Sequence, residues 1–441
     1  MLSRKGLPIT RKQIKRIALT IISVILIIIA VERTYNMNPE FHVDAQDASY
    51  YGIVEAKLTT SEKLEDFKYL YEVLEENYPF FEVNKRLHNV DWLGNRDKYK
   101  RIIRNTKNDA EFYAALDKIL NDLNNGHVNV FDGRVYKMFY KSYYLYFANN
   151  STNPYKYLSQ YDVFSSPEVM YRYKFNGTQE ELENVEVLGG DTKLESKILI
   201  PGKVAYMKFQ KMGHYYTSKE DRKRIKEFLK EVEDYEKIIL DIRGNTGGYD
   251  TYWEYIVSLL ANKPLSYSYY SFFKDSHINT YKYGTFRITG LRSINLLDKE
   301  TLSKIPDEVK NDFDYFKRYT ISINPWSENI NSEDYIDFKG KVYLLVDRNV
   351  FSSAERFAFF AKDSGFATLI GEPTGGDGPF EAIPFIYLPN SKFVIRFSRE
   401  LGINSDGTIN MEAKTTPHIL VDPTPNEDFT KDACIQAAIN D

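Results

Sequence analysis

Two adjacent serines, Ser352 and Ser353, stand where a hydroxyl group could act as a nucleophile. An apolar, β-rich run at residues 342–346 precedes them. The segment that follows has apolar residues at the helical spacing i, i+3, i+4, i+7: Ala354, Phe357, Ala358 and Ala361. A serine at such a strand-to-helix turn is exposed and lies at the positive end of a helix dipole. The alternative interpretation is that the serines only cap the helix, as serine commonly does.

A glycine-rich segment, residues 241–248 (DIRGNTGG), lies between a short apolar strand and a predicted helix. Glycine at Gly247 and Gly248 lets backbone N–H groups approach a ligand closely, as an oxyanion hole requires. A phosphate loop is the competing functional interpretation, but neither G-x-x-x-x-G-K-[ST] nor G-x-G-x-x-G is present. A tight turn whose glycines serve only helix packing is the structural alternative.

A serine hydroxyl needs a base to become nucleophilic near neutral pH. Among the six histidines, His127 follows a glycine at the junction between a helical region and an alternating run, residues 128–130. An imidazole can be exposed and aimed at such a junction. A carboxylate that orients the imidazole would complete a relay. Glu412, shortly before Pro417, is a candidate, although spacing alone does not distinguish it among the 62 acidic residues.

Length and composition limit the classes of protein to consider. A chain of 441 residues suits two or three domains of roughly 150 residues each. A net charge of −4 offers no reason to expect a nucleic-acid partner. Cys434 is the only cysteine, which excludes an intrachain disulfide and a cysteine-ligated metal site.

The N-terminal segment has the pattern of an export signal. Residues 1–16 are rich in Lys and Arg, residues 17–31 carry no charge, and Glu32 and Arg33 follow. This order is typical of a signal peptide or a signal anchor. Residues 28–30 form a poor cleavage site. The pattern therefore favours an uncleaved anchor, with its positive end in the cytoplasm and most of the chain outside.

Periodicity divides the remaining chain into regions. Alternating strand and helix patterns from residue 196 onward predict an α/β layered core, and residues 218–221 resemble a helix capping box. The predicted parts are a signal anchor or signal peptide (1–33), a linker (34–58), an N-terminal helical domain that carries the histidine (59–133), a small region of short strands and loops without a clear PDZ motif (134–195), and the α/β core (196–441) with an insertion at 264–338.

These segments together resemble the S41 serine peptidases, the group of tail-specific and tricorn-core enzymes. The matching segments, in the family's order, are residues 123–127 (L-x-D-G/S-H), 241–248 (D-x-R-G-N-x-G-G), 352–355 (S-A-x-E), 371–376 (G-E-x-T-x-G) and the late Glu412 with Pro417. The resemblance covers about residues 60–133 and 196–425. It implies a ClpP/crotonase-like layered core that follows a small helical domain and an N-terminal membrane segment.

The resemblance also implies roles for individual residues. Ser352 aligns with the nucleophile, and Ser353 would supply a backbone N–H to the oxyanion hole together with Gly247 or Gly248. Tail-specific enzymes use a Ser–Lys dyad. At the position of that lysine this chain has Asp377, which cannot serve as a neutral amine base.

The tricorn-type arrangement therefore fits better. It combines a serine, a histidine from the helical region and a late glutamate, which correspond to Ser352, His127 and Glu412. That arrangement has a serine directly before the histidine, where this chain has Gly126. The link from Glu412 to His127 would then run through water or another side chain.

The sequence thus predicts an extracytoplasmic serine peptidase that hydrolyses peptide bonds through an acyl-enzyme. It needs no metal or organic cofactor, and its partners are a peptide or protein substrate and, through the N-terminal segment, the membrane. Specificity would lie in a pocket between the helical region and the core, roofed by the 264–338 insertion. The alternative function is a catalytically inactive S41-fold protein that binds a peptide or another ligand. A surface structural or adhesion protein would leave the ordered motifs unexplained.

Overall fold

The structure is a computed structural model that describes residues 45–149, 158–187, 189, 191–214, 218–276, 278, 288–325, 336–378 and 383–441. The predicted signal anchor or signal peptide, residues 1–33, lies outside the described residues. Within the described ranges, no helix combines the length and the apolar character that a membrane crossing needs. Residues 46–441 form one compact unit.

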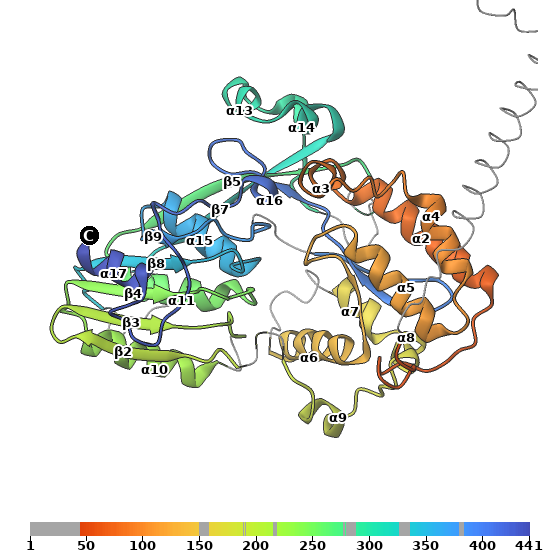
Figure 1. Cartoon of the computed structure of the whole chain (residues 1–441), viewed down its shortest axis with the longest axis horizontal. Helices are drawn as coiled ribbons and strands as arrows, with labels where there is room; N and C mark the ends of the chain where they lie inside the picture. Colours follow the sequence, from red (N-terminus) through yellow and green to blue (C-terminus); the bar gives the residue numbers. More distant parts are fainter. Residues whose placement is uncertain are drawn as a thin grey trace, which may run out of the picture. The chain divides into compact units, whose positions relative to one another are not determined.

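A six-stranded sheet with the order β13-β9-β8-β4-β3-β2 forms the core (Figure 1). All neighbours pair in parallel except β2 and β3, which are antiparallel. The strands are β2 (Glu195–Ile200), β3 (Val204–Lys208), β4 (Lys237–Asp241), β8 (Lys341–Val346), β9 (Thr368–Gly371) and β13 (Ile419–Leu420). Central strands such as β4 and β8 are apolar between their charged end residues because helices cover both faces of a parallel sheet.

The two faces of this sheet are covered by different helices. Side chains such as Leu240 and Leu344 pack with α10 (Lys219–Glu231), α11 (Asp250–Leu260) and α15 (Ser353–Asp363). The alternate side chains, such as Ile239 and Leu345, pack against Cys434 and Ile435 of α17 (Ala433–Asn440). The predicted α/β layered core and its strands and helices from residue 196 onward are confirmed.

The N-terminal region is helical, as the sequence predicts. Its helices are α2 (Thr60–Asn77), α3 (Phe81–His88), α4 (Arg96–Arg104) and α5 (Asp109–Asn121). A capping box between Thr59 and Glu62 starts α2. After α5, the short strand β1 (Asn129–Val130) pairs antiparallel with β11 (Val394–Arg396), which also pairs with β10 (Phe385–Tyr387). This sheet joins the helical region to a segment far along the chain.

Two local predictions are wrong. The described part of residues 134–195 forms helices up to residue 183 instead of short strands: α6 (Gly133–Asn149), α7 (Leu158–Ser165), α8 (Pro167–Arg172) and α9 (Gln179–Glu183). Aromatic residues favour strands locally, but here Tyr136 and Tyr140 lie one helical turn apart on α6, with ring centroids 6.5 Å apart. Tyr136 also stacks on Tyr173, at the end of α8, with ring centroids 4.2 Å apart. The helix α10 does begin after Ser218, yet the Ser218 side chain makes no capping bond and donates to the His214 carbonyl oxygen instead.

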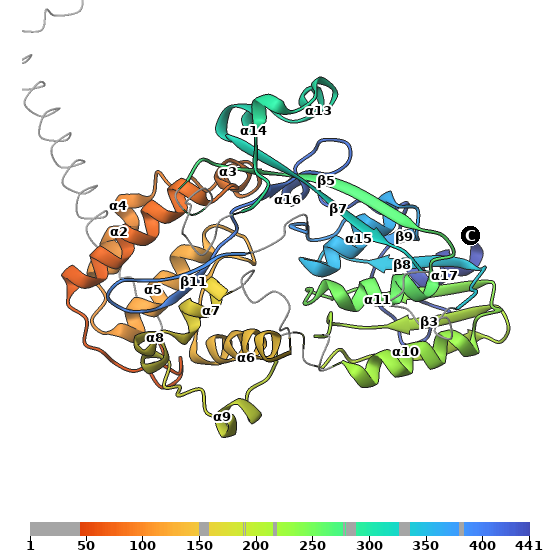
Figure 2. The same ribbon diagram turned by 180° about the vertical axis from the view of Figure 1, so that it is seen from behind.

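The 264–338 insertion contains a long antiparallel pair, β5 (Leu265–Phe273) and β7 (Tyr315–Ile323). The strands β12 (Leu401–Gly402) and β6 (Arg292–Ser293) extend this pair on its two sides. Figure 2 shows the pair as a twisted ribbon that runs from beside β9 to beside α3, next to α13 (Lys299–Lys304) and α14 (Asp307–Asp312). At its far end, Ser276 Oγ donates to Asn77 Oδ1 at 2.5 Å.

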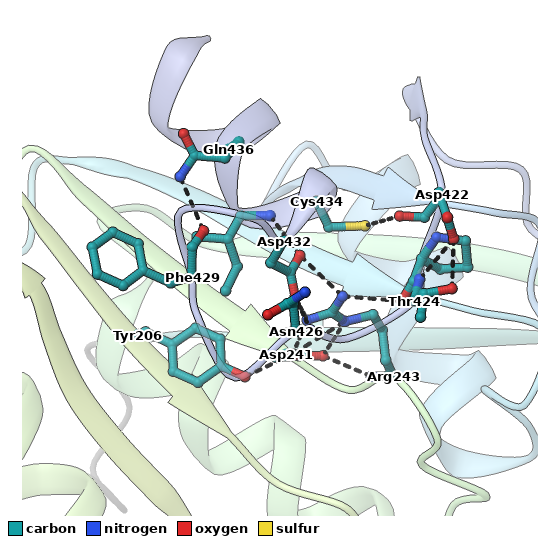
Figure 3. Close-up of polar contacts among 12 residues, drawn as sticks. Tyr206, Asp241, Arg243, Asp422, Thr424, Asn426, Phe429, Asp432, Cys434 and Gln436 are labelled. Atoms are coloured by element: carbon teal, nitrogen blue, oxygen red, sulfur yellow. Dashed lines mark hydrogen bonds and ion pairs between the residues drawn. The ribbon is translucent and has the colours of Figure 1, made fainter.

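A buried ion cluster fixes the start of the glycine-rich segment (Figure 3). The Arg243 Nη2 lies 2.6 Å from Asp241 Oδ2 and 2.9 Å from Asp432 Oδ2, and Tyr206 donates its hydroxyl proton to Asp241 Oδ2 at 2.7 Å. Burial alone would lower the pKa of Arg243, but the hydrogen bonds and charges of Asp241 and Asp432 raise it. The cluster ties the segment after β4 to the C-terminal helix.

Removing the cation from this cluster should strongly destabilise the fold. Arg243→Met should lower the free energy of unfolding by about 3–5 kcal/mol, because two carboxylates would remain buried without a counter-charge. Urea denaturation followed by circular dichroism measures this change. The matched control is Lys68→Met, which removes an ion pair whose Lys and Glu72 side chains are 63% and 47% exposed. The control should change stability by no more than about 0.5 kcal/mol, and equal losses in both variants would contradict the prediction.

Candidate active site

Ser352 occupies a strained turn between β8 and α15. Its backbone has φ 60° and ψ −124°, a conformation that a residue with a side chain rarely adopts. The Ser352 side chain makes no capping hydrogen bond, so the interpretation that it only caps the helix is wrong. The turn instead directs the hydroxyl group toward an imidazole. This geometry is typical of a nucleophile elbow.

His127 lies between Ser352 and a carboxylate. Its Nε2 is 3.0 Å from Ser352 Oγ, and its Nδ1 is 2.7 Å from Asp377 Oδ2. The side chain is buried, its backbone N–H donates to Asn125 Oδ1 at 2.7 Å, and its ring centroid lies 4.6 Å from that of Phe351. Three segments far apart in the sequence therefore meet in one hydrogen-bonded line of serine, histidine and aspartate.

The loop that carries Asp377 is held from several sides. Asp377 has a positive φ of 55°, and Ser398 Oγ donates to its Oδ2 at 3.4 Å. The next residue, Gly378, donates its N–H to Asn410 Oδ1 at 3.2 Å, and Asn410 Nδ2 donates to Glu355 Oε1 at 2.8 Å. The Asp377 carboxylate is therefore positioned by packing from α15 and from α16 (Asn410–Ala413).

The structure does not bring Glu412 to His127, which corrects the predicted relay. Glu412 lies on α16, and its carboxylate accepts from Arg86 Nε at 2.9 Å and from Arg86 Nη2 at 2.6 Å. Arg86 also pairs with Glu308 of α14. The four-residue helix α16 turns Asn410 toward the Asp377 loop and presents Glu412 to Arg86 of α3. The sequence predicted a link from Glu412 to His127 through water or another side chain, because Gly126 replaces the family's serine. No such link is needed, because Asp377 contacts His127 directly.

Sequence reasoning considered Asp377 only as the residue that replaces a dyad lysine. A signal was nevertheless present, because Asp377 stands between two glycines directly after the predicted strand and its glycine-rich loop. Such a loop allows the tight, positive-φ backbone that Asp377 adopts. Proximity in space to His127, 250 positions earlier, was not visible from the sequence.

The three residues predicted for the oxyanion hole line the same cleft but differ in their backbone N–H groups. The N–H of Gly247 donates to Asn245 Oδ1 at 2.9 Å, so it is already engaged. Among the described residues, the N–H groups of Gly248 and Ser353 have no hydrogen-bond partner. A Cβ on Gly247 would lie 2.8 Å from the Phe351 oxygen and 2.9 Å from Ser352 Cβ, so glycine is required there for close approach.

Burial sets the protonation state of His127. Burial lowers the pKa of His127 below its ordinary value, although the charge of Asp377 and its hydrogen bond act in the opposite direction. The imidazole is therefore neutral near pH 7. A neutral imidazole whose Nδ1–H donates to Asp377 has a free lone pair on Nε2, which can accept the proton of Ser352.

Any reaction that uses His127 as its base should therefore persist into mildly acidic solution. A protonated His127 cannot act as a base, so such a reaction is lost as the pH falls through the pKa of His127, which burial holds below the ordinary value for histidine. The acid limb of kcat/KM plotted against pH, which reports the free enzyme, measures this midpoint. A midpoint above about 7 would contradict the assigned environment of the imidazole.

A cleft of 1210 Å³ opens beside these residues. It is lined by residues of the N-terminal helices, such as Tyr113 of α5 and Phe139 of α6, and by residues of the α/β core, such as Thr246 and Tyr249. The predicted position of the pocket between helical region and core agrees with this lining. None of the lining residues comes from the described parts of the 264–338 insertion, so the predicted roof is not observed there.

Comparison with protein families gives two matches along the chain. The model of "Peptidase family S41" matches residues 203–421, and the model of "Tricorn protease C1 domain" matches residues 59–121. The first range contains Ser352, Asp377 and the two glycines of the predicted oxyanion hole, Gly247 and Gly248. His127 lies outside the two ranges. A search of curated proteins found no match to this chain.

A search of solved structures gives several matches, and the first of the following shows a similar fold. A protein from Parabacteroides merdae ATCC 43184 is 20% identical with a TM-score of 0.52, over 86% of this chain and 96% of that one. Mature CPAF complexed with lactacystin is 12% identical with a TM-score of 0.49, over 82% and 93% of the two chains. A lipoprotein from Streptococcus agalactiae is 11% identical with a TM-score of 0.41, over 83% and 95%.

Proposed function

The chain belongs to peptidase family S41 and is a serine-type peptidase, and we propose that it cleaves peptide bonds outside the cytoplasm through Ser352, His127 and Asp377. One observation carries the assignment of these residues. His127 contacts Ser352 through one ring nitrogen, at 3.0 Å, and Asp377 through the other, at 2.7 Å. The layered sheet with helices on both faces supports a ClpP/crotonase-like core.

The proposed reaction is acyl transfer. Asp377 accepts a hydrogen bond from His127 Nδ1–H, which leaves Nε2 to take the proton of Ser352 as its Oγ attacks the peptide carbonyl carbon. The N–H groups of Gly248 and Ser353 hold the oxyanion of the tetrahedral intermediate. His127 then gives the proton to the leaving amine. A water molecule, activated by the same imidazole, releases the acyl group from Ser352.

The alternative of an inactive binding protein rested on Gly126 and Asp377 as departures from the family pattern. Asp377 is the partner of His127, so it supplies the orienting carboxylate instead of removing a catalytic group. Gly126 lacks a side chain that could join a relay, but the direct contact makes such a group unnecessary. Neither departure therefore favours the binding protein.

Labelling with a fluorophosphonate tests the proposed nucleophile. The probe should label the wild-type protein once, at Ser352, and should fail to label Ser352→Ala and His127→Ala. Ser353→Ala is the matched control, because only the backbone of Ser353 has a proposed role, and it should still be labelled. Absence of labelling in the folded wild-type protein, or labelling at another serine, would contradict the assignment.

We also propose that residues 1–33 anchor the chain in a membrane with the peptidase outside the cytoplasm. The basic segment followed by the uncharged residues 17–31 supports this proposal. The full chain, produced in a bacterial host, should sediment with the membranes and be digested by a protease added to spheroplasts. Intact chain in the cytoplasmic fraction, protected from that protease, would contradict the proposal.

A further inference from the structure

The middle strand of the small sheet presents one arginine to the cleft. Arg396 of β11 lies opposite Asn129 of β1 on one side and opposite Phe385 of β10 on the other. Residues directly opposite each other in antiparallel strands project from the same face. All three side chains line the cleft that contains Ser352 and His127.

The Arg396 guanidinium has neutral partners. Its Nη2 donates to the Gly126 carbonyl oxygen at 2.7 Å, its Cζ lies 5.5 Å from the centre of the Phe139 ring, and its Nε is buried without a hydrogen-bond partner. Burial lowers the pKa of Arg396 to about 10, so the group remains a cation at neutral pH. Among the described residues, no carboxylate forms an ion pair with it.

Other cations at the cleft are compensated or exposed. Arg134 pairs with Glu186 at 2.7 Å, and Arg356 pairs with Asp250 at 2.7 Å. Lys211 is exposed to water, and its Nζ donates to Thr246 Oγ1. Arg396 thus combines partial burial with the absence of a directly paired carboxylate; the charge of Asp377, which is paired with His127, acts on it only through space. Such an arrangement is costly unless an anion arrives, and a carboxylate, the anion that peptide side chains supply, matches the two parallel N–H groups of a guanidinium.

The position of Arg396 relative to the scissile bond follows from its contact with Gly126. Gly126 directly precedes His127, so the guanidinium lies beside the element that carries the imidazole. His127 protonates the leaving amine in the proposed reaction, so the residues on the leaving-group side of the bond pass next to this element. The rings of Phe139 and Phe385 provide apolar surface for the methylene groups of an entering side chain.

We propose that Arg396 determines specificity by binding the carboxylate of an acidic side chain in the peptide substrate, on the leaving-group side of the scissile bond. The proposal rests on the peptidase function proposed above. It predicts a preference between substrates, whereas the relay of Ser352, His127 and Asp377 determines whether any substrate is cleaved.

Pairs of short internally quenched peptides that differ only by Glu or Gln at one position test this proposal. The position is moved in turn along both sides of the cleavage site, and all peptides carry an amidated C-terminus. The wild-type enzyme should cleave the Glu peptide about tenfold faster or more, in kcat/KM, at a position after the scissile bond. Arg396→Gln should lose this preference and still cleave the Gln peptide, while Arg396→Lys should retain part of it.

Lys211→Gln is the matched control, because it removes a cation from the same cleft, and its preference should equal that of the wild type. Several outcomes would overturn the proposal. In the wild type, these are no preference for Glu at any position, or a preference only at positions before the scissile bond. In Arg396→Gln, they are a preference that persists, or a kcat/KM that falls equally for the Glu and Gln peptides. In a second set of the same peptides with a free C-terminus, a preference that appears only with the free carboxylate would also overturn it.

The same experiment separates this proposal from the proposed function. Cleavage of the Gln peptides by the wild type without a preference for Glu contradicts only the role of Arg396. Failure to cleave any peptide, together with absence of fluorophosphonate labelling at Ser352, contradicts the peptidase function, and the specificity proposal falls with it.

Discussion

Asp377→Asn should lower kcat for peptide hydrolysis by roughly 10⁴-fold, the size of effect seen when the aspartate of a serine protease triad is replaced by asparagine. The carboxylate accepts a hydrogen bond from His127 Nδ1 at 2.7 Å and stabilises the imidazolium that forms during attack. An amide at this position can donate to Nδ1, which favours the wrong tautomer and places a proton on Nε2. Steady-state hydrolysis of a quenched peptide measures the loss.

Glu412→Gln is the decisive control for this prediction, because the resemblance to the S41 family assigns Glu412 the role proposed here for Asp377. Glu412 is bound to Arg86, and Arg86 keeps Glu308 as a partner when the charge of Glu412 is removed. This variant should therefore remain within about threefold of the wild type, as expected for loss of a partly exposed ion pair. The reverse order of effects, with Glu412→Gln nearly inactive and Asp377→Asn active, would contradict the assignment of Asp377 and support a Ser–His–Glu relay.

Ser352→Ala should reduce kcat/KM for peptide hydrolysis by at least about 10³-fold while the protein remains folded. The nucleophile is lost, and neither His127 nor the backbone donors can form an acyl-enzyme without it. Alanine tolerates the φ of 60° at this position no worse than serine does, so thermal unfolding should change little.

Ser353→Ala again supplies the matched comparison, since it removes the neighbouring hydroxyl and keeps the backbone N–H. It should retain most of the activity, because its backbone, not its hydroxyl, faces the reaction in the proposed mechanism. Hydrolysis by Ser352→Ala at the wild-type rate would exclude Ser352 as the nucleophile. Loss of activity in both serine variants, with both proteins folded, would mean that the hydroxyl of Ser353 is also required.

Local patterns in the sequence were sufficient to predict many of the strands and helices of this protein. The apolar runs that became β4, β8 and β9, the helical spacing after Ser352, and the glycines at 247 and 248 each depend on residues close together in the chain. Hydrophobic periodicity and turn chemistry are local properties, so they can be read from neighbouring residues. Local position also made the serine at the turn and the histidine at the end of the helical region candidates, and the resemblance to the S41 family selected them.

Only the tertiary structure decided which groups meet. The carboxylate beside His127 depends on how α16 packs Asn410 against the Asp377 loop, and Asn410 and Arg86 together direct Asp377 and Glu412 to different partners. Likewise, the Gly247 N–H donates to the side chain of Asn245 at 2.9 Å, an engagement that the glycine spacing by itself does not specify. Composition identified 62 acidic residues, but the choice among them needs the distances that long-range packing sets, which no local pattern contains.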